Sequence, residues 1–153
     1  MNIGLSKEKR EEIAQILNKM LATTYAIYLK TQNYHWNITG REFFSHHILL
    51  EKQYEEMAEA IDEIAERTRA LGENPPGSFS AFGKLSEVEE ENENPPAVEM
   101  LKRLTKDHEK LIVYIRENSE KVEKFHDGAT ADLMNKRLAI HAKSAWMLRS
   151  STS

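Results

Sequence analysis

The sequence contains no cysteine, which excludes disulfide scaffolds, Cys-ligated zinc, iron–sulfur clusters and thiol catalysis together. A metal site in this chain must therefore use histidine and carboxylate side chains. No apolar stretch approaches the roughly 20 residues that cross a bilayer, and the first twelve residues lack the apolar core of a secretory signal. The sequence therefore predicts a cytoplasmic protein with no membrane partner.

Proline and glycine are also scarce, at 4 and 6 of 153 residues, whereas 30% of residues are charged and 40% are hydrophobic. This composition excludes collagen-like and low-complexity chains and is typical of a helical protein. The length suits a single domain over residues 1–153. A formal net charge of -4 disfavours a whole surface that neutralises phosphates and leaves room only for a local basic patch.

Apolar residues recur with the i, i+3, i+4, i+7 spacing of amphipathic helices in four segments. The first starts after Ser6 and lasts to about Trp36, and Asn37 to Gly40 reads as a short turn. The other three stripes cover residues 50–72, 96 to about 125, and about 131 to 148.

The pattern breaks over residues 73–94, which contain Pro75-Pro76-Gly77, a short apolar patch and an acidic run at residues 87–91 expected to be a solvated loop. A short first connection, a long second and a short third fit a bundle with one crossover better than an up-down-up-down bundle. The sequence therefore predicts an all-α protein, a ferritin-like four-helix bundle whose long crossover carries a short helix.

A second, polar face runs along the second helix, away from its apolar stripe. His47 and Glu51 are four residues apart, as are Asp62 and Glu66, so each pair shares one side of the helix. His35 lies at the end of the preceding helix. Histidine and carboxylate ligands without thiolate suit iron or manganese, and zinc less specifically.

The two pairs cannot serve one metal within one chain, because His47 and Asp62 are about 22 Å apart along a helix. They are, however, symmetric about a point between residues 56 and 57. If two copies of the helix meet antiparallel there, His47 lies opposite Glu66 and Glu51 opposite Asp62, while Ala58 allows close approach. The alternative is that these residues are an ordinary solvated helix face.

Three segments resemble one family. They are residues 30–37, with Gly40, Phe43, His47 and Glu51 after them, then residues 62–67, and finally Ala145-Trp146-Met147-Leu148-Arg149-Ser150. Together they closely resemble the Dps family, the mini-ferritins named as DNA-binding proteins from starved cells. The resemblance covers nearly the whole chain. Two positions depart from it: Glu51 stands where many members have Asp, and Ala142 stands where an acidic residue often follows His141.

The resemblance implies a ferroxidase site between two subunits, with His35, His47 and Glu51 of one chain facing Asp62 and Glu66 of its neighbour. It implies a shell of twelve subunits that binds ferrous iron, oxidises it with hydrogen peroxide in preference to dioxygen, and stores the ferric mineral inside. Trp36 is then a candidate electron donor to the site. The turn between the third and fourth helices resembles an acidic iron-entry pore, with Glu123, Asp127 and Asp132 as its candidate carboxylates.

Two other functions compete with this one. A ferritin with its site inside one bundle needs two E-x-x-H motifs, and this chain has one, ending at His126 near a helix end. A non-enzymatic, DNA-compacting shell is the other alternative. In the family, a Lys-rich tail often carries DNA binding. Here the basic residues at positions 7, 9 and 10 are countered by Glu8, Glu11 and Glu12.

His108 and His141 lie on the apolar stripes of the third and fourth helices. Histidines on such stripes are expected to be core or interface residues with satisfied hydrogen bonds rather than metal ligands.

Overall fold

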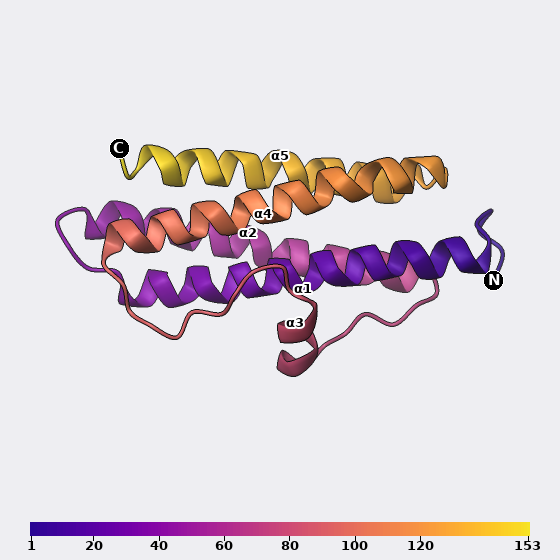
Figure 1. The fold of residues 1–153 in the computed structure, drawn as a ribbon, viewed down its shortest axis with the longest axis horizontal. Helices are drawn as coiled ribbons and strands as arrows, with labels where there is room; N and C mark the ends of the chain where they lie inside the picture. The colour runs from indigo at the N-terminus through magenta and orange to yellow at the C-terminus, as the bar shows by residue number, and fades with distance from the viewer.

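The computed structural model describes residues 1–153 and contains five helices and no strand. Four long helices form the bundle, and a short fifth lies in the crossover (Figure 1). They are α1 (Lys7–Asn37), α2 (Phe43–Ala70), α3 (Phe79–Leu85), α4 (Ala97–Lys124) and α5 (Gly128–Ser150). The predicted all-α bundle with a helix in its long crossover is confirmed.

The ends of the helices follow their local chemistry. The Ser6 hydroxyl accepts a hydrogen bond from the Lys9 amide at 3.3 Å and begins α1. After α1, Gly40 adopts a φ of 121°, which a residue without a β-carbon takes most readily. α2 begins at Phe43, ahead of the first residue of the apolar stripe. The stripe does not reveal this start, because residues 43–45 are exposed and residues 46–49 are only half-buried. α5 likewise begins at Gly128, earlier than the stripe indicates, because Asp127 caps it.

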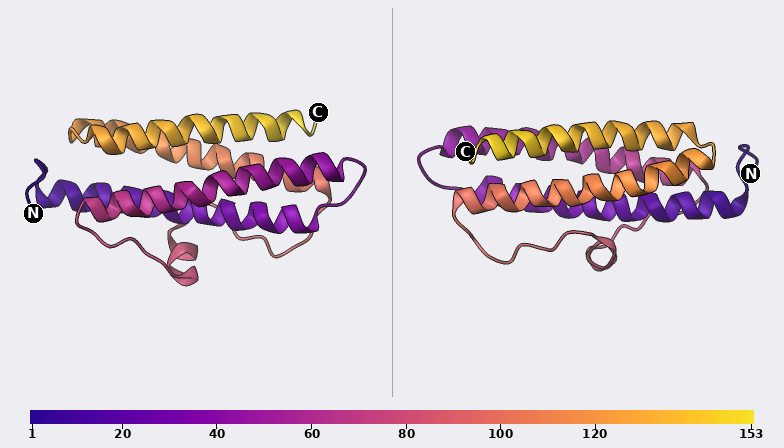
Figure 2. Two further views of the ribbon diagram at one scale, coloured as in Figure 1. Left: turned by 180° about the vertical axis from the view of Figure 1, so that it is seen from behind. Right: turned by 45° about the horizontal axis from the view of Figure 1, so that its top comes forward.

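The core lies between two helix pairs, α1 with α2 and α4 with α5, which stack on each other (Figure 2). Apolar side chains from all four helices are buried there. Each Å² of apolar surface removed from water stabilises the fold by about 25 cal/mol. Among the core residues are Leu17, Met20, Leu21, Leu50, Met57, Ile64, Leu104, Leu111, Ile115, Met134 and Leu148.

The crossover runs beside α1, and its short helix α3 contacts α1 (Figure 1). Phe82 of α3 stacks on Tyr25 with ring centroids 4.8 Å apart. The acidic run is only partly solvated, because Glu91 accepts hydrogen bonds from the hydroxyl of Tyr34 and from Arg103 (2.9 Å) and its side chain is 5% exposed. Burial, together with the Glu91 carboxylate, raises the pKa of Tyr34. These partners compensate the desolvation of Glu91, which periodicity alone does not reveal.

None of the helices has the length and apolar character that a membrane crossing requires.

Candidate metal centre

The turn between α1 and α2 brings His35 and His47 together. Their imidazole rings stack with centroids 3.7 Å apart and planes within 13° of parallel. Each ring also contacts the backbone of the other residue: His35 Nδ1 lies 2.9 Å from the His47 carbonyl oxygen, and His47 Nδ1 lies 2.8 Å from the His35 carbonyl oxygen. The two histidines therefore hold each other in a reciprocal arrangement.

This arrangement decides where the ring protons are. A carbonyl oxygen can only accept a hydrogen bond, so both Nδ1 atoms must donate and carry hydrogen. In a neutral imidazole the other nitrogen, Nε2, then holds a free lone pair. Backbone carbonyls commonly fix metal-binding histidines in this way. His35 and His47 thus offer two oriented nitrogen ligands.

The carboxylates of the predicted site are distributed along α2. Glu51 lies one helical turn beyond His47 and is half-buried, whereas Asp62 and Glu66 are exposed. The single chain brings no group of three or more histidine or carboxylate side chains into a metal-binding arrangement. It therefore joins His35 to His47 and leaves Asp62 and Glu66 apart from them.

Aromatic rings surround the histidine stack. Phe43 stacks on His47 with ring centroids 5.0 Å apart. Tyr54 and His35 form an edge-to-face pair with ring centroids 5.2 Å apart. Burial raises the pKa of Tyr54, and the nearby carboxylate of Glu51 raises it further, so the phenol is protonated at neutral pH. Tyr54 lies within the apolar stripe of residues 50–72, which predicts a core position and no role beside the histidines. Tyr54 is three residues after Glu51 and seven after His47, and this spacing indicates that its side chain lies on the same side of the helix as theirs.

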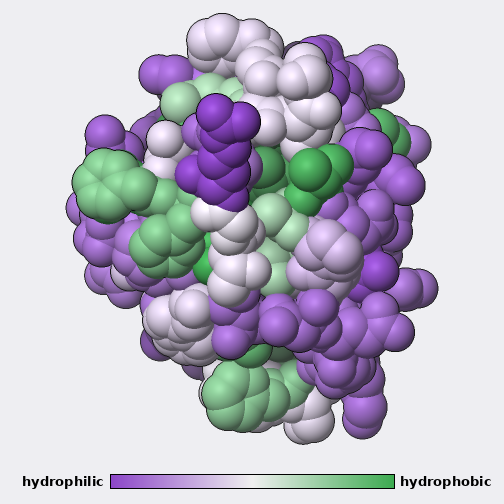
Figure 3. Space-filling model, turned by 90° about the vertical axis from the view of Figure 1, so that its left-hand side faces the viewer, coloured by the Kyte–Doolittle hydropathy of each residue, from purple (hydrophilic) through white to green (hydrophobic).

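The end of the bundle that carries this turn exposes apolar side chains among hydrophilic ones (Figure 3). Trp36 is 63% exposed and Phe44 is 74% exposed. Trp36 follows His35 directly, but the aromatic neighbours of the His35 ring are His47 and Tyr54. An electron-donor role for Trp36 thus stays a prediction.

The three candidate pore residues differ in their surroundings. Glu123 and Asp132 are exposed, but the side chain of Asp127 is 4% exposed. Asp127 accepts hydrogen bonds from the Thr130 amide at 3.2 Å and from Arg67 at 2.8 and 3.0 Å. Burial works to raise the pKa of Asp127, but hydrogen bonds from the Thr130 hydroxyl, from Arg67 and from the Thr130 amide outweigh it and hold the pKa below its usual value. Asp127 therefore caps α5 and neutralises Arg67, which leaves Glu123 and Asp132 as free carboxylates.

His108 of α4 and His141 of α5 form a second histidine pair, inside the bundle, where each is 1% exposed. Their Nδ1 atoms are 2.9 Å apart, and Arg137 Nη2 lies 3.1 Å from His141 Nε2. Arg137 also binds Glu56 of α2. The expected burial is confirmed, but the hydrogen bonding is incomplete, because His108 Nε2 has no partner.

Burial, with a further contribution from the charge of Arg137, lowers the pKa of His108 to about 3. Burial also lowers the pKa of His141, with contributions from His108 and Arg137. Both rings are thus neutral. The guanidinium at His141 Nε2 opposes a metal cation there, which supports a structural role for this pair.

The amino end of α1 carries its basic residues among acidic ones. Lys7 forms an ion pair with Glu11 at 3.6 Å, which agrees with the charge balance seen in the sequence.

Comparison with known proteins agrees with this fold. The model of the ferritin-like domain family matches residues 14–152. A low temperature-induced protein of Nostoc sp. is 41% identical over 98% of this chain and 85% of its own length. A DNA protection during starvation protein of Porphyromonas gingivalis is 36% identical over 95% of this chain and 91% of its own length.

Among solved structures, the Dps protein of Vibrio cholerae superposes with a TM-score of 0.95 at 31% identity. The match covers 100% of this chain and 96% of that one, which is described as a ferritin-like diiron-carboxylate protein. The predicted resemblance is thereby confirmed in both sequence and fold. The chain belongs to the Dps family, the iron-storing mini-ferritins within the ferritin-like proteins.

Proposed function

We propose that this protein oxidises ferrous iron at sites shared between two subunits and stores the ferric product inside a closed shell. The observation that carries the proposal is the His35–His47 stack, in which both Nδ1 atoms donate to carbonyls and both Nε2 atoms keep their lone pairs. Such paired, preorganised nitrogens are arranged for metal binding.

The proposed ligands are His35, His47 and Glu51 from one subunit and Asp62 and Glu66 from its partner. Two ferrous ions supply the two electrons that reduce one hydrogen peroxide to two water molecules, with two protons consumed. Carboxylates stabilise the harder ferric product, so the oxygen ligands assist the oxidation. Hydrogen peroxide is the proposed oxidant, with dioxygen as the alternative.

The shared site is supported by exposed α2 residues that have no role within one chain. Asp62 and Glu66 are exposed on α2, and Ala58 is an exposed small residue near the point about which the ligand positions are symmetric. An antiparallel meeting of two α2 helices there would pair each histidine end with the acidic end of the other chain.

Mixed assemblies test the shared site. His47→Ala and Asp62→Ala chains, each assembled alone, should both lose rapid iron oxidation. Coexpressed with different tags, they should regain about a quarter of the wild-type sites, because about half of the dimers are mixed and each has one intact site. The measurement is stopped-flow absorbance of ferric iron formation with hydrogen peroxide.

The matched control for this experiment is Glu63→Ala, which removes an exposed α2 carboxylate that pairs with Lys136 at 3.0 Å. It should leave oxidation unchanged. If assemblies that carry both tags are isolated and they oxidise iron no faster than the single variants, the shared site is wrong.

Storage requires a closed shell, for which we propose the family's twelve subunits. Twelve chains of 17.7 kDa give about 210 kDa. Light scattering should find this mass across dilution. A stable dimer would contradict storage, because a dimer encloses no cavity.

We further propose that ferrous iron enters past Glu123 and Asp132. Both are exposed carboxylates flanking the turn between α4 and α5, and such groups concentrate cations at a constriction. Asp132→Asn should slow iron uptake at low ionic strength, where steering by charge is strongest, without changing assembly. Equal uptake rates for wild type and variant there would assign Asp132 to the solvated surface.

A further inference from the structure

Two buried polar contacts tie the last turns of α1 to the rest of the bundle. Lys30 forms an ion pair with Asp107 of α4, in which Nζ lies 2.6 Å from Oδ2. One turn further along α1, the hydroxyl of Tyr34 donates a hydrogen bond to the Glu91 carboxylate of the crossover. Tyr34 directly precedes His35. Both contacts therefore hold the segment of α1 that ends in a proposed metal ligand.

These contacts form two successive links between the same two helices. Arg103 of α4 donates to Glu91 at 2.9 Å, so the Tyr34 contact also reaches α4. Arg103 lies one helical turn before Asp107 on α4. Lys30 likewise lies one turn before Tyr34 on α1. The end of α1 is thus joined to α4 at two neighbouring levels.

Burial makes the position that these contacts define a strict one. The side chains of Lys30 and Asp107 are 7% and 8% exposed, and Tyr34 is fully buried. A buried charge or hydroxyl that loses its partner is left without water to replace it. Hydrogen bonds are also directional, so they tolerate little displacement of the groups that they join. The end of α1 therefore has one favoured place against α4.

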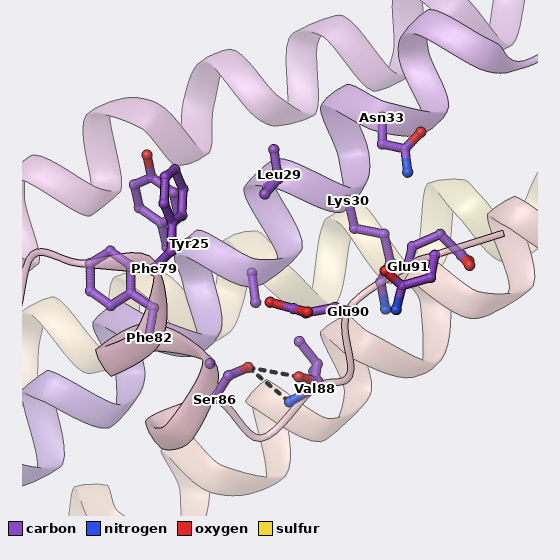
Figure 4. A pocket seen from close by; sticks show the side chains of 13 residues that line it. Tyr25, Leu29, Lys30, Asn33, Phe79, Phe82, Ser86, Val88, Glu90 and Glu91 are labelled. Carbon is purple, nitrogen blue, oxygen red and sulfur yellow. Dashed lines mark hydrogen bonds between the residues drawn. The ribbon is translucent and has the colours of Figure 1, made fainter. Parts of the chain in front are cut away.

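Apolar packing does not hold the crossover at this point. Lys30 and Glu91 lie at the edge of a cavity of about 260 Å³ between α1 and the crossover (Figure 4). On the far side of this cavity, Phe82 of α3 stacks on Tyr25 of α1. Between the aromatic stack and Glu91 the cavity separates the two segments. The polar contacts thus fix the part of the crossover that lies nearest to the histidines.

We propose that Tyr34, with Glu91 as its acceptor and Arg103 behind Glu91, is a positioning residue for His35. The inference rests on the proposed shared iron site. The hydrogen bonds that His35 and His47 exchange fix the two rings relative to each other. They do not fix the pair on the bundle, because both residues flank the same turn and can move with it.

The position of the histidine pair matters because the partner subunit supplies the other ligands of the proposed site. A displacement of the α1–α2 turn changes the distances from both Nε2 atoms to those carboxylates together. The link from Tyr34 to α4 prevents this displacement. Loss of the link should therefore weaken metal binding, whereas the oxidation step at a filled site is affected less.

The test measures the affinity of the assembled protein for cobalt(II), which binds without an oxidant and is followed by its visible absorbance. Tyr34→Phe keeps the ring and removes only the hydroxyl. It should raise the cobalt Kd by about 10-fold, the lower end of what residues behind metal ligands contribute. The ferrous iron concentration at half-maximal oxidation rate should rise by a similar factor, with a smaller change in the maximal rate. His35→Ala should abolish the cobalt signal and so identifies the site.

The matched control is Tyr114→Phe. The Tyr114 hydroxyl also joins α4 to α1, because it donates to the Ile16 carbonyl oxygen at 3.0 Å. Ile16 lies about 28 Å from His35 along α1. Both variants should lose stability to denaturant, but only Tyr34→Phe should bind cobalt more weakly. A merely structural hydrogen bond would lower stability in both proteins and leave the cobalt Kd of both unchanged.

Variants of the acceptor sharpen the assignment. Glu91→Leu removes the acceptor and should weaken cobalt binding about as much as Tyr34→Phe. Glu91→Gln still offers an oxygen to the Tyr34 hydroxyl and should recover most of the affinity. The double variant Tyr34→Phe/Glu91→Leu should bind cobalt no more weakly than either single variant, because both changes break the same contact.

Two results would overturn the positioning role. One is a wild-type cobalt Kd in Tyr34→Phe, and the other is an equal loss of affinity in Tyr34→Phe and Tyr114→Phe, which would indicate a general loosening of α1. Either result leaves the proposed function intact, provided that His35→Ala abolishes binding. Wild-type protein that binds cobalt no better than His35→Ala rejects the proposed metal centre itself.

Discussion

The molecule contains two histidine pairs with opposite properties. In the His35–His47 pair both Nδ1 atoms donate to backbone carbonyls, which leaves both Nε2 atoms free to bind. In the His108–His141 pair the Nδ1 atoms face each other at 2.9 Å and the rings are buried in the bundle. The atoms around each histidine ring thus decide whether the ring is available to a metal or is packed inside the core.

The neighbours of the buried pair determine which ring nitrogens carry hydrogen. Arg137 can only donate, so His141 Nε2 accepts and His141 Nδ1 carries the hydrogen. His141 Nδ1 therefore donates to His108 Nδ1, and the hydrogen of His108 lies on Nε2, which has no partner. The His108–His141 pair thus uses three of its four nitrogens on protein contacts, whereas the His35–His47 pair uses two.

The largest expected difference between the pairs is in iron oxidation. His35→Ala should slow ferrous oxidation by at least about 100-fold, because a metal ligand is removed and even residues behind the ligands are worth about 10- to 100-fold. His141→Leu should retain the wild-type rate in assembled protein. Stopped-flow absorbance under equal iron loading measures both, and comparable losses in the two variants would contradict the division of roles.

A smaller effect is expected on stability, and here the buried His108–His141 pair matters more than the His35–His47 pair. His141→Leu leaves His108 Nδ1 without its donor and should cost about 1–3 kcal/mol of unfolding free energy. The double variant His108→Leu/His141→Leu should recover part of that loss, because both polar partners are then gone. Denaturant unfolding at fixed protein concentration measures these values. An additive double variant would show that the two rings do not interact.

The effect that is smallest near neutral pH is a dependence of stability on pH that belongs to the buried pair. In the folded protein the pKa of His108 is about 3, below the ordinary value of 6.5. Between these two pH values the unfolded chain binds a proton at His108 and the folded chain does not. Stability should therefore fall as the pH drops below 6.5, by up to about 1.4 kcal/mol per pH unit for each such histidine.

Unfolding measured between pH 7 and 4.5 tests this dependence. The double variant His108→Leu/His141→Leu should show a shallower decline than wild type, and the difference between the two curves removes the contribution of carboxylates. Parallel curves would show that the two rings titrate normally in the folded protein.

The fold was predictable because its signals are local. Helical periodicity, the Ser6 cap and the glycine after α1 act within a few residues, so they identified four long helices and the crossover. The shared face of His47 with Glu51, and of Asp62 with Glu66, follows from helix geometry in the same way. The candidate ligands could therefore be proposed without a structure.

Contacts between distant segments decided the rest. The exchange of hydrogen bonds between His35 and His47, the contact of Tyr54 with His35, and the burial of Asp127 against Arg67 join different helices. Spacing along one helix states which residues share a face, but not which atoms that face meets across the bundle. By itself the sequence determined the helices and the candidate ligands. Only packing between helices decided which nitrogens are free, which carboxylates are neutralised and which tyrosine adjoins the His35–His47 pair, because these contacts join residues far apart in the chain.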